Sequence, residues 1–558
     1  MIGVIAYSPQ FAAVREFFEL FKTPWEWAEK GREYDVLLCT ADAELGDYSA
    51  SLLLLYSGRQ LRFDREANVI GSDEKCGRIL GREHDCMPVY GETRTFPDGV
   101  ASVLRDAESG DAVLHECRFR NTGVVRIGYD LFVEIQHLLA TGQSSQYAGI
   151  PTLELHIDLL RSLILRAGIP VIEIPPVPAG YQSITCLTHD VDHPSIRRHK
   201  ADHTVIGLMY RAVAGSFVNM LQGRMRFQDV LTNWTAALKL PLIYLGFATD
   251  FWADFAEQYL EAEGGIRSTY FVIPFAGDAG HAGHAGQPPQ GPAPRYRAAC
   301  YGARDIAGSI KTLTAAGCEV GLHGLDAWRD SAKAAGEFEE IRRLTGAAEM
   351  GTRMHWLYYD DDSPAVLERA GASYDSTIGY RETVGYRAGT SQAYKPLNAE
   401  RLLELPLHVM DTALFYPAYM GLSAPEATTV LQRFADDLAR FGGCLTLNWH
   451  DRSLAPERLW IRCYRDLLHD LRSRKTWFAT CGQAVRWFCR RRSVVFTDRG
   501  DTQGVLVTAA SRDDEPDLIV RTHAPIRGNV THASGEAQCV DMVLNGKIEI
   551  DLGARQTS

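Results

Sequence analysis

Apolar residues recur along the chain at two different spacings, and this pattern predicts a mixed α/β protein. Near the start, Ile2–Ala6 and Asp35–Cys39 are short apolar runs typical of strands, and Phe11–Phe21 between them has apolar positions at helical spacing. Further helices are expected at about Leu131–Thr141 and Thr152–Ala167. Strands and helices that alternate in this way favour an α/β layer. Residues 1–175 are therefore predicted to form an N-terminal α/β domain of unassigned role.

The alternation resumes after a proline-rich segment and continues to about residue 490. Pro175–Gly180 is typical of a stiff, extended linker, so we place a domain boundary there. Residues 195–264 look mainly helical and are expected to be an insertion. After it, Arg267–Ile273 and Cys318–His323 are predicted strands, separated by a helix at Asp305–Ala316. This order suits a parallel-stranded barrel whose catalytic groups lie at the C-terminal ends of the strands.

Residues 491–558 have a different pattern, with short β-like runs separated by Asp, Gly and Pro. Such runs predict a small all-β appendage. With 558 residues, the chain is too long for one ordinary core, and two or three domains are expected. The sequence therefore predicts three domains, at 1–175, 181–490 and 491–558.

Composition and charge exclude some classes of partner. Apolar residues make up 46% and charged residues 23%, as in globular proteins, and the net charge of −12 argues against nucleic acid or an anionic membrane as a main partner. The apolar run Leu240–Phe251 is too short to span a membrane, and the N-terminus has no features of a signal peptide. The twelve cysteines form no Cys-x-x-Cys pair, which favours free thiols and a reducing, cytoplasmic location. The insertion nevertheless carries basic residues, interpreted as a solvated face or, less favoured, as a rim for an acidic glycan: Arg197, Arg198, Lys200, Arg211 and Arg224.

The run Ile184–Pro194 carries the most informative polar residues. Side chains at alternate positions of a strand point to the same face, so Thr188, Asp190 and Asp192 should lie together. Two carboxylates this close are costly unless a cation neutralises one of them. An isolated Asp-x-Asp could also be a solvated strand end. Three later runs, however, also end apolar strands in metal-binding or catalytic residues: Gly321–Gly324, Gly351–Trp356 and Leu445–His450.

Together these four runs resemble the motifs of the polysaccharide deacetylases, also known as NodB-homology or carbohydrate esterase family four proteins. The resemblance covers about residues 181–490. It implies a distorted, seven-stranded (β/α) barrel and a divalent metal, zinc before others, held by protein ligands and open to water. It also implies a carbohydrate substrate with an N-acetylated sugar.

The resemblance also assigns roles to individual residues. It implies that Asp190 is the general base and that Asp192 and His323 bind the metal. The family's third ligand is a histidine four residues after the first, where this chain has Ala327. We expect His355 to replace it, since it lies two residues after Arg353 on the same strand face. Alternatives for this third ligand are His193, His408 and, less favoured, Asp326.

The remaining site residues follow from the same resemblance. Arg353 should hold Asp190 in its charged form. His450 matches the histidine that protonates the leaving amine, and Asp375 resembles the carboxylate that orients it. An apolar wall beside the acetyl group or the sugar is expected from Trp356, Tyr380 and Trp449, although core packing explains these aromatic residues equally well.

The sequence thus predicts a metal-dependent hydrolase that removes N-acetyl groups from an amino sugar in a polysaccharide or its precursor. Two alternatives stay open. One is hydrolysis of a non-sugar amide or imide, and the other is a catalytically silent glycan-binding or assembly protein. The presence of both Asp190 and His450 argues against the silent protein, because a binding protein has no need of an acid–base pair.

Overall fold

The chain divides into two compact units. The computed structural model describes residues 1–72, 75–82, 85–120, 122–200, 202–221, 225–283, 291–498, 504–510, 515–525 and 538–551. The first unit comprises Met1–Gly180, Tyr386–Leu397 and Trp487–Ser558, and the second comprises Tyr181–Gly385 and Asn398–Arg486. The boundary at Gly180 coincides with the end of the predicted proline-rich linker.

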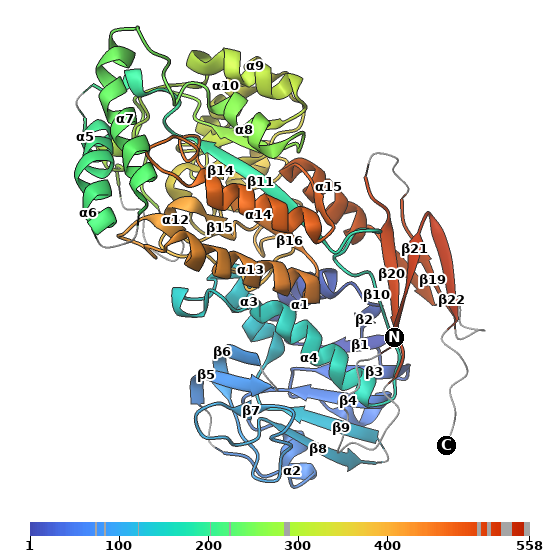
Figure 1. The fold of residues 1–558 in the computed structure, drawn as a ribbon. Coiled ribbons are helices and arrows are strands. Elements are labelled where there is room, and N and C mark those ends of the chain that lie inside the picture. The colour runs from blue at the N-terminus through green and yellow to red at the C-terminus, as the bar shows by residue number, and fades with distance from the viewer. Residues whose placement is uncertain are drawn as a thin grey trace. The chain divides into compact units, whose positions relative to one another are not determined.

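The first unit contains the predicted α/β layer (Figure 1). Its main sheet has the order β2-β1-β3-β4-β9-β8, in which only the β8–β9 pair is antiparallel. The strands are β1 (Ile2–Ile5), β2 (Trp25–Trp27), β3 (Glu33–Cys39), β4 (Ser49–Tyr56), β8 (Leu114–Phe119) and β9 (Thr122–Ile127). The helices are α1 (Phe11–Phe21), α2 (Arg62–Glu66), α3 (Leu131–Ala140) and α4 (Thr152–Arg166), so the helices predicted near 11, 131 and 152 are confirmed. A second sheet has the order β6-β5-β7, from β5 (Lys75–Arg82), β6 (Asp85–Thr93) and β7 (Arg105–Asp106).

The C-terminal strands belong to this first unit, which corrects the prediction of a separate appendage at 491–558. Strand β20 (Leu518–His523) pairs antiparallel with β10 (Val171–Glu173), which precedes the linker, and with β21 (Cys539–Leu544). A hydrogen-bonding contact also joins β10 and β20, in which Nε2 of His523 lies 2.8 Å from Oε1 of Glu173. Another three-stranded sheet consists of β18 (Val495–Asp498), β19 (Gly504–Thr508) and β22 (Lys547–Asp551). Long-range strand pairing of this kind has no local sequence signal.

The second unit is built on a seven-stranded parallel sheet centred on β11 (Ser183–Val191). Its order is β14-β13-β12-β11-β16-β15, and β17 pairs with the start of β11. All nine residues of β11 are buried, as expected for a central strand covered on both faces. The other strands are β12 (Thr269–Val272), β13 (Glu319–Gly324), β14 (Thr352–Met354), β15 (Val409–Met410), β16 (Cys444–Asn448) and β17 (Thr476–Phe478).

The sheet continues beyond β14 without a complete strand. Isolated bridges join Thr352 to Asp375 and Asp375 to Glu404. Backbone hydrogen bonds from Leu405 N to Asp375 O and from Leu407 N to Ile378 O join this segment to the residues that lead into β15. In the same stretch, His408 donates its backbone N–H to Thr446 O of β16. Because all seven strands run parallel, their C-terminal ends meet at one edge, which brings together motifs far apart in the sequence.

Helices cover this sheet, and the predicted helical insertion is confirmed. The insertion contains α5 (His203–Met209), a π-helical segment (Tyr210–Gly215), α6 (Ser216–Leu221), α7 (Phe227–Tyr244) and α8 (Phe255–Glu263). The later helices are α9 (Ala307–Ala315), α10 (Ser331–Thr345), α11 (Ser363–Arg369), α12 (Asp411–Phe415), α13 (Ala424–Phe441), α14 (Ile461–Ser473) and α15 (Cys481–Arg492). Among the described residues, no helix is both long and apolar enough to cross a membrane.

Candidate active site

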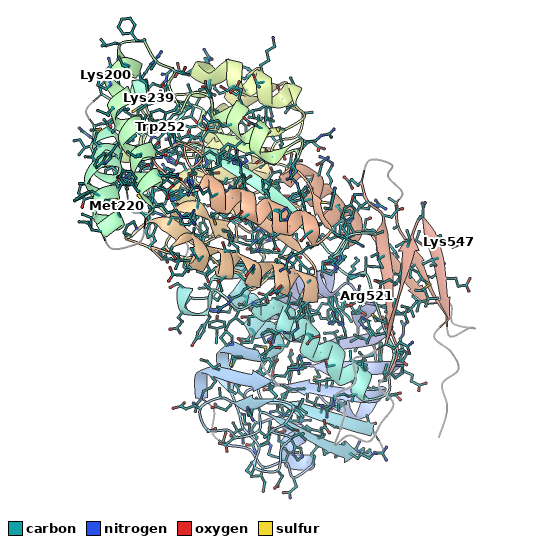
Figure 2. All side chains as sticks on the ribbon, viewed as in Figure 1. Lys200, Met220, Lys239, Trp252, Arg521 and Lys547 are labelled. Atoms are coloured by element: carbon teal, nitrogen blue, oxygen red, sulfur yellow. The ribbon has the colours of Figure 1, made fainter. Side chains whose placement is uncertain are left out.

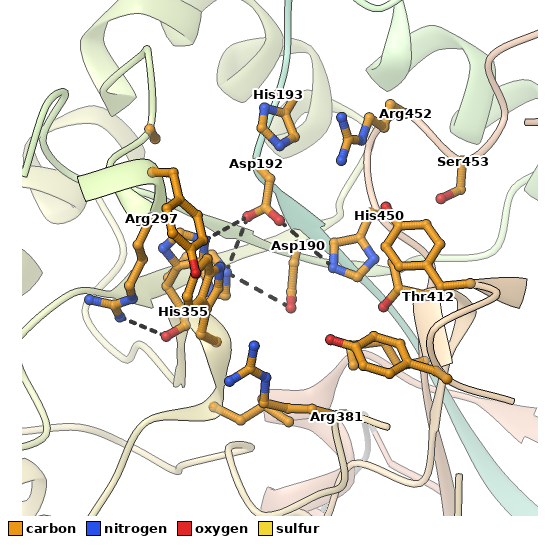
Figure 3. A pocket seen from close by; sticks show the side chains of 18 of the residues that line it. Asp190, Asp192, His193, Arg297, His355, Arg381, Thr412, His450, Arg452 and Ser453 are labelled. Carbon is orange, nitrogen blue, oxygen red and sulfur yellow. Dashed lines mark hydrogen bonds and ion pairs between the residues drawn. The ribbon is translucent and has the colours of Figure 1, made fainter. Parts of the chain in front are cut away.

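The C-terminal ends of the parallel strands open into a pocket of about 400 Å³ (Figure 3). Asp190 and Asp192 reach it from the end of β11, and His323 reaches it from β13. His355 and His450 follow directly after β14 and β16. The four motifs that carry the family resemblance therefore meet in one place.

Asp192, His323 and His355 form a three-residue group suited to a metal ion. Their ligand atoms all lie within 4.8 Å of one another. The Oδ1 atom of Asp192 is 3.4 Å from Nε2 of His323 and 3.6 Å from Nε2 of His355. Two imidazoles and one carboxylate, with further pocket space beside them, match the donor set of an open catalytic zinc site.

A backbone carbonyl orients the ring of His323, and an arginine side chain holds the backbone at His355. Nδ1 of His323 lies 2.9 Å from the carbonyl oxygen of Arg353, which fixes the proton on Nδ1 and leaves the Nε2 lone pair toward Asp192. The carbonyl oxygen of His355 accepts a 2.6 Å hydrogen bond from Nη2 of Arg297. The next two residues, Trp356 and Leu357, have positive φ angles of 66° and 54°. A non-glycine residue in this region costs about 1–3 kcal/mol, so the turn that presents His355 is strained.

The electrostatics of the group favour a bound cation. Oδ1 of Asp192 is buried and has no hydrogen-bond partner within the described part of the chain. Burial would raise the pKa of Asp192, but His355, His323 and His450 hold it well below its usual value. Burial also lowers the pKa of His355 well below 6.5, which favours the neutral ring that a metal ion needs. A carboxylate and neutral imidazoles are the forms that bind a divalent ion, so the residues present fit one.

Asp190 is held next to this group in a fixed geometry. Its Oδ1 accepts a 2.9 Å hydrogen bond from Nη1 of Arg353, as the sequence predicted. Its Oδ2 accepts a 2.8 Å hydrogen bond from Nδ2 of Asn448 and lies 3.9 Å from Nε2 of His323. Asn448 was not predicted, although it lies in the same motif as His450, and strands β16 and β11 pair there with Thr188 opposite Asn448.

His450 is oriented by Asp411, and this corrects the prediction that Asp375 does so. Nδ1 of His450 lies 2.6 Å from Oδ1 of Asp411, and the backbone N–H of His450 donates to Oδ2 of the same carboxylate. Asp375 lies instead in the sheet wall, where its Oδ1 accepts hydrogen bonds from Ser376 N and Thr377 Oγ1. It takes part in the bridges described above and does not line the pocket.

The neighbouring carboxylates keep His450 protonated. Burial would lower the pKa of His450, but Asp411, Asp192 and Asp190 raise it to about 10. Its Nε2 is 3.8 Å from Oδ2 of Asp192, so the protonated ring edge faces the pocket. An imidazolium in this position can donate a proton to a leaving group.

The three predicted aromatic residues lie in different environments. Trp356 lines the pocket, and Arg381 lies over its ring at 5.1 Å. Trp449 is fully buried, with its ring centroid 5.2 Å from that of Tyr464, and it does not line the pocket, as the core-packing alternative expects. Its two neighbours in sequence face the other way, since Asn448 donates to Asp190 and His450 lines the pocket. Tyr380 is 4% exposed and does not line the pocket, whereas its neighbour Arg381 does.

The alternatives for the third ligand lie elsewhere or have other partners. His408 is buried, and its Nδ1 accepts a hydrogen bond from Thr446 N. Asp326 pairs with His281 and Lys333. His193 lines the pocket, but its Nδ1 is 3.1 Å from Nε2 of His199. His199, Asp202 and Cys300 form a second group whose ligand atoms lie within 4.8 Å of one another.

One wall of the pocket is basic. Arg381, Arg452 and Arg458 line it together with Tyr416. Nη2 of Arg458 donates to the Tyr416 hydroxyl at 2.9 Å, whereas its buried Nε and Nη1 have no hydrogen-bond partner among the described residues. Burial would raise the pKa of Tyr416, but Arg458 and Arg452 lower it to about 8. The wall therefore offers hydrogen-bond donors and positive charge to a bound molecule.

Comparisons with known proteins give weak matches. No protein-family model matches the chain, and no curated protein matches its sequence. Among solved structures, it is similar to a putative polysaccharide deacetylase from Mycobacterium smegmatis, with 16% identity over 56% of this chain and 94% of the other, at a TM-score of 0.34. A probable polysaccharide deacetylase from Pseudomonas aeruginosa PAO1 has 15% identity over 57% of this chain and 94% of the other, also at 0.34.

A third similar structure is PuuE allantoinase, with 15% identity over 56% of this chain and 92% of the other, at a TM-score of 0.34. At such identities and scores, these likenesses carry no conclusion about activity.

Proposed function

We propose that the chain is a metal-dependent hydrolase that removes N-acetyl groups from an amino sugar in a polysaccharide or its precursor. The observation that carries the proposal is the arrangement at the end of β11. A possible metal group, Asp192 with His323 and His355, lies between a carboxylate held by Arg353 and a histidine held by Asp411. Amide hydrolysis needs these three components together: an electrophilic centre, a base and an acid.

Asp192, His323 and His355 would hold the metal. A bound divalent ion, most simply Zn²⁺, would polarise the amide carbonyl and make water easier to deprotonate. Asp190 would accept the proton from the attacking water, because the hydrogen bonds from Arg353 and Asn448 fix its carboxylate beside the metal group. The protonated Nε2 of His450 would donate to the departing amine, and Asp411 would stabilise the imidazolium throughout.

The experiment is acetate release from N-acetylglucosamine oligomers by the full chain loaded with zinc. Wild-type protein should release acetate, and Asp190→Asn should lower kcat by about 100- to 10,000-fold, the usual contribution of a general base. Metal content should stay unchanged in this variant, which separates the base from the ligands. A matched control is Asp436→Asn, since Asp436 is 69% exposed in the same unit and contacts Arg474. This control should keep wild-type turnover.

Other outcomes would point to the alternative functions. The protein could release no acetate from any N-acetylated saccharide but hydrolyse a cyclic amide or imide in a reaction that depends on Asp190. This result would assign it to the non-sugar amide or imide hydrolases. Saccharide binding by calorimetry without turnover in either assay would indicate a glycan-binding protein. Normal turnover in Asp190→Asn would reject the proposed mechanism itself.

A further inference from the structure

Helix α7 of the insertion has two apolar faces, and only one of them is buried. The buried face contains Val230, Ala236, Ala237, Leu240 and Ile243, which pack toward the rest of the second unit. The opposite face carries large apolar residues at helical spacing along α7 and just beyond it: Phe227, Leu231, Trp234, Leu238, Leu242 and Leu245. These side chains are between 38% and 78% exposed. A surface helix of a globular protein normally has polar residues on that face.

The segment before α7 repeats this arrangement. From α5 to α6, Thr204, Leu208, Ala212 and Ser216 are buried at a spacing of four. Exposed apolar residues occupy the other side: Ile206, Tyr210, Val213, Phe217 and Leu221. Two adjacent helical segments therefore each present an apolar stripe to solvent.

The two stripes lie side by side. The indole N–H of Trp234 in α7 donates to the carbonyl oxygen of Val213 in the π-helical segment at 3.4 Å. Figure 2 draws the outward side chains of these helices, where Met220 and Lys239 are labelled. Of the 25 large apolar side chains that are exposed in the described part of the chain, fifteen fall between Ile206 and Phe247. Such a concentration marks an interaction site, because isolated exposed apolar residues would be spread over the surface.

The charge of this segment is opposite to that of the whole chain. Residues 195–247 contain seven lysines and arginines against two aspartates, in a chain of net charge −12. Arg197, Arg198, Lys200, Arg226 and Lys239 are exposed, whereas Arg224 lies outside the described residues. Of the two acidic residues, Asp229 pairs with Arg462, and Asp202 accepts hydrogen bonds from the first turn of α5. The chain therefore has a local surface that is basic and apolar, although its net charge is negative.

We propose that α5, the π-helical segment, α6 and α7 dock on an anionic lipid surface. The apolar stripes would enter the boundary between head groups and acyl chains, and the surrounding lysines and arginines would contact anionic head groups. Tyr210 and Trp234 have the amphipathic rings that favour this boundary. A second copy of this chain is the weaker alternative, because two identical basic surfaces would repel each other.

This proposal goes beyond the proposed function and does not rest on it. The insertion follows directly after Asp192 and His193. Near its far end, the ring centroid of Trp252 lies 6.2 Å from that of His193, which lines the pocket. Docking would therefore place the catalytic unit at a lipid surface, where a membrane-attached substrate is presented.

The test is flotation of the full chain with two kinds of vesicle, one of phosphatidylcholine and one that also contains phosphatidylglycerol. We expect binding to the anionic vesicles, weakened by added salt. Leu238→Glu combined with Leu245→Glu should abolish binding, and Arg226→Glu with Lys239→Glu should lower it by about fivefold or more for each residue. Brominated lipid should quench tryptophan fluorescence in wild type and less so in Trp234→Phe.

The matched control is Val540→Glu with Val543→Glu, at 56% and 58% exposed positions of the first unit, which should bind like wild type. Thermal unfolding of each variant separates lost binding from lost folding. Absence of binding by wild type, or equal binding by the Leu238/Leu245 variant, would overturn the proposal. A wild-type dimer that dissociates in that variant, without vesicle binding, would assign the surface to a second copy.

Discussion

Asp411 contacts His450 twice, through its Oδ1 at Nδ1 of the ring and through its Oδ2 at the backbone N–H. This double contact fixes both the position and the tautomer of the histidine. Ser453 Oγ also donates to Asp411, so the carboxylate is itself held in place. Asp411 is therefore a positioning residue for the proposed general acid.

The first prediction concerns this pair. Asp411→Asn should lower kcat on an N-acetylated sugar by about 100- to 10,000-fold, because the amide cannot stabilise an imidazolium and can hold the wrong tautomer. Metal content should not change, since Asp411 is not among the three grouped residues. The check is steady-state kinetics beside elemental analysis. Turnover within a few-fold of wild type would show that His450 does not need this partner.

The second prediction tests the third metal ligand. His355→Ala should lose bound zinc by elemental analysis, while His281→Ala should retain it, because His281 pairs with Asp326 outside the three-residue group. Loss of an outer hydrogen-bond partner alone costs about 10- to 100-fold in metal affinity, so loss of a ligand should cost more. His199→Ala separates the second group from the first and should leave the catalytic ion in place. Full occupancy in His355→Ala would contradict the assignment.

Some residues of the candidate site could be predicted from the sequence, and others could not. Asp190, Asp192, His323 and His355 end apolar runs, and parallel strands bring such ends together, so their meeting was predictable. Asp411 was not, because the run that it ends, Leu405–Met410, is not one of the four runs that carry the family resemblance and forms only a two-residue strand, β15. Strand pairing places Met410 beside Asn448, and only this long-range contact brings Asp411 to His450. The pairing of β10 with β20 could not be predicted either, because it is also a contact between segments far apart in the sequence.

Side-chain direction was the other limit. Trp449 lies in sequence between Asn448, which contacts Asp190, and His450, which lines the pocket, yet its own side chain is buried in the core. Applying the same alternation that grouped Asp190 with Asp192 would have placed Asn448 and His450 on one side and Trp449 on the other. The apolar residues of the α7 stripe recur at helical spacing, so the stripe could be predicted from the sequence. Its exposure could not, because exposure depends on how the insertion packs.

The third prediction concerns the basic wall of the pocket. Arg458→Gln should raise KM by about 10- to 100-fold with a smaller change in kcat, because a hydrogen bond to a charged group contributes about 1.5–3 kcal/mol. The reason is that two buried donors of Arg458 have no partner among the described residues and lie at the pocket. Arg462→Gln is the control, since Arg462 is 59% exposed and pairs with Asp229. An unchanged KM would show that Arg458 serves only to hold Tyr416.

The fourth prediction is a pH dependence of stability in the first unit. His156 is fully buried, its Nδ1 is 3.1 Å from the Tyr129 hydroxyl, and burial lowers its pKa from 6.5 to about 3. Between these two values, the unfolded chain binds a proton that the folded chain does not. The contribution to stability is therefore complete above about pH 6.5 and is lost as the pH falls toward 3.

For this single group, the free energy of unfolding should fall by about 2 kcal/mol between pH 7 and pH 5. The measurement is hydrogen exchange of the α4 amides across this range, because it reports on the helix that carries His156. Between pH 7 and pH 5, the change in the free energy of unfolding should be less unfavourable by about 2 kcal/mol in His156→Gln than in wild type, since glutamine does not titrate. His115→Gln, a change at a partly exposed histidine of the same unit, should leave the dependence as in wild type. The same pH dependence in wild type and His156→Gln would show that other groups control acid unfolding of this unit.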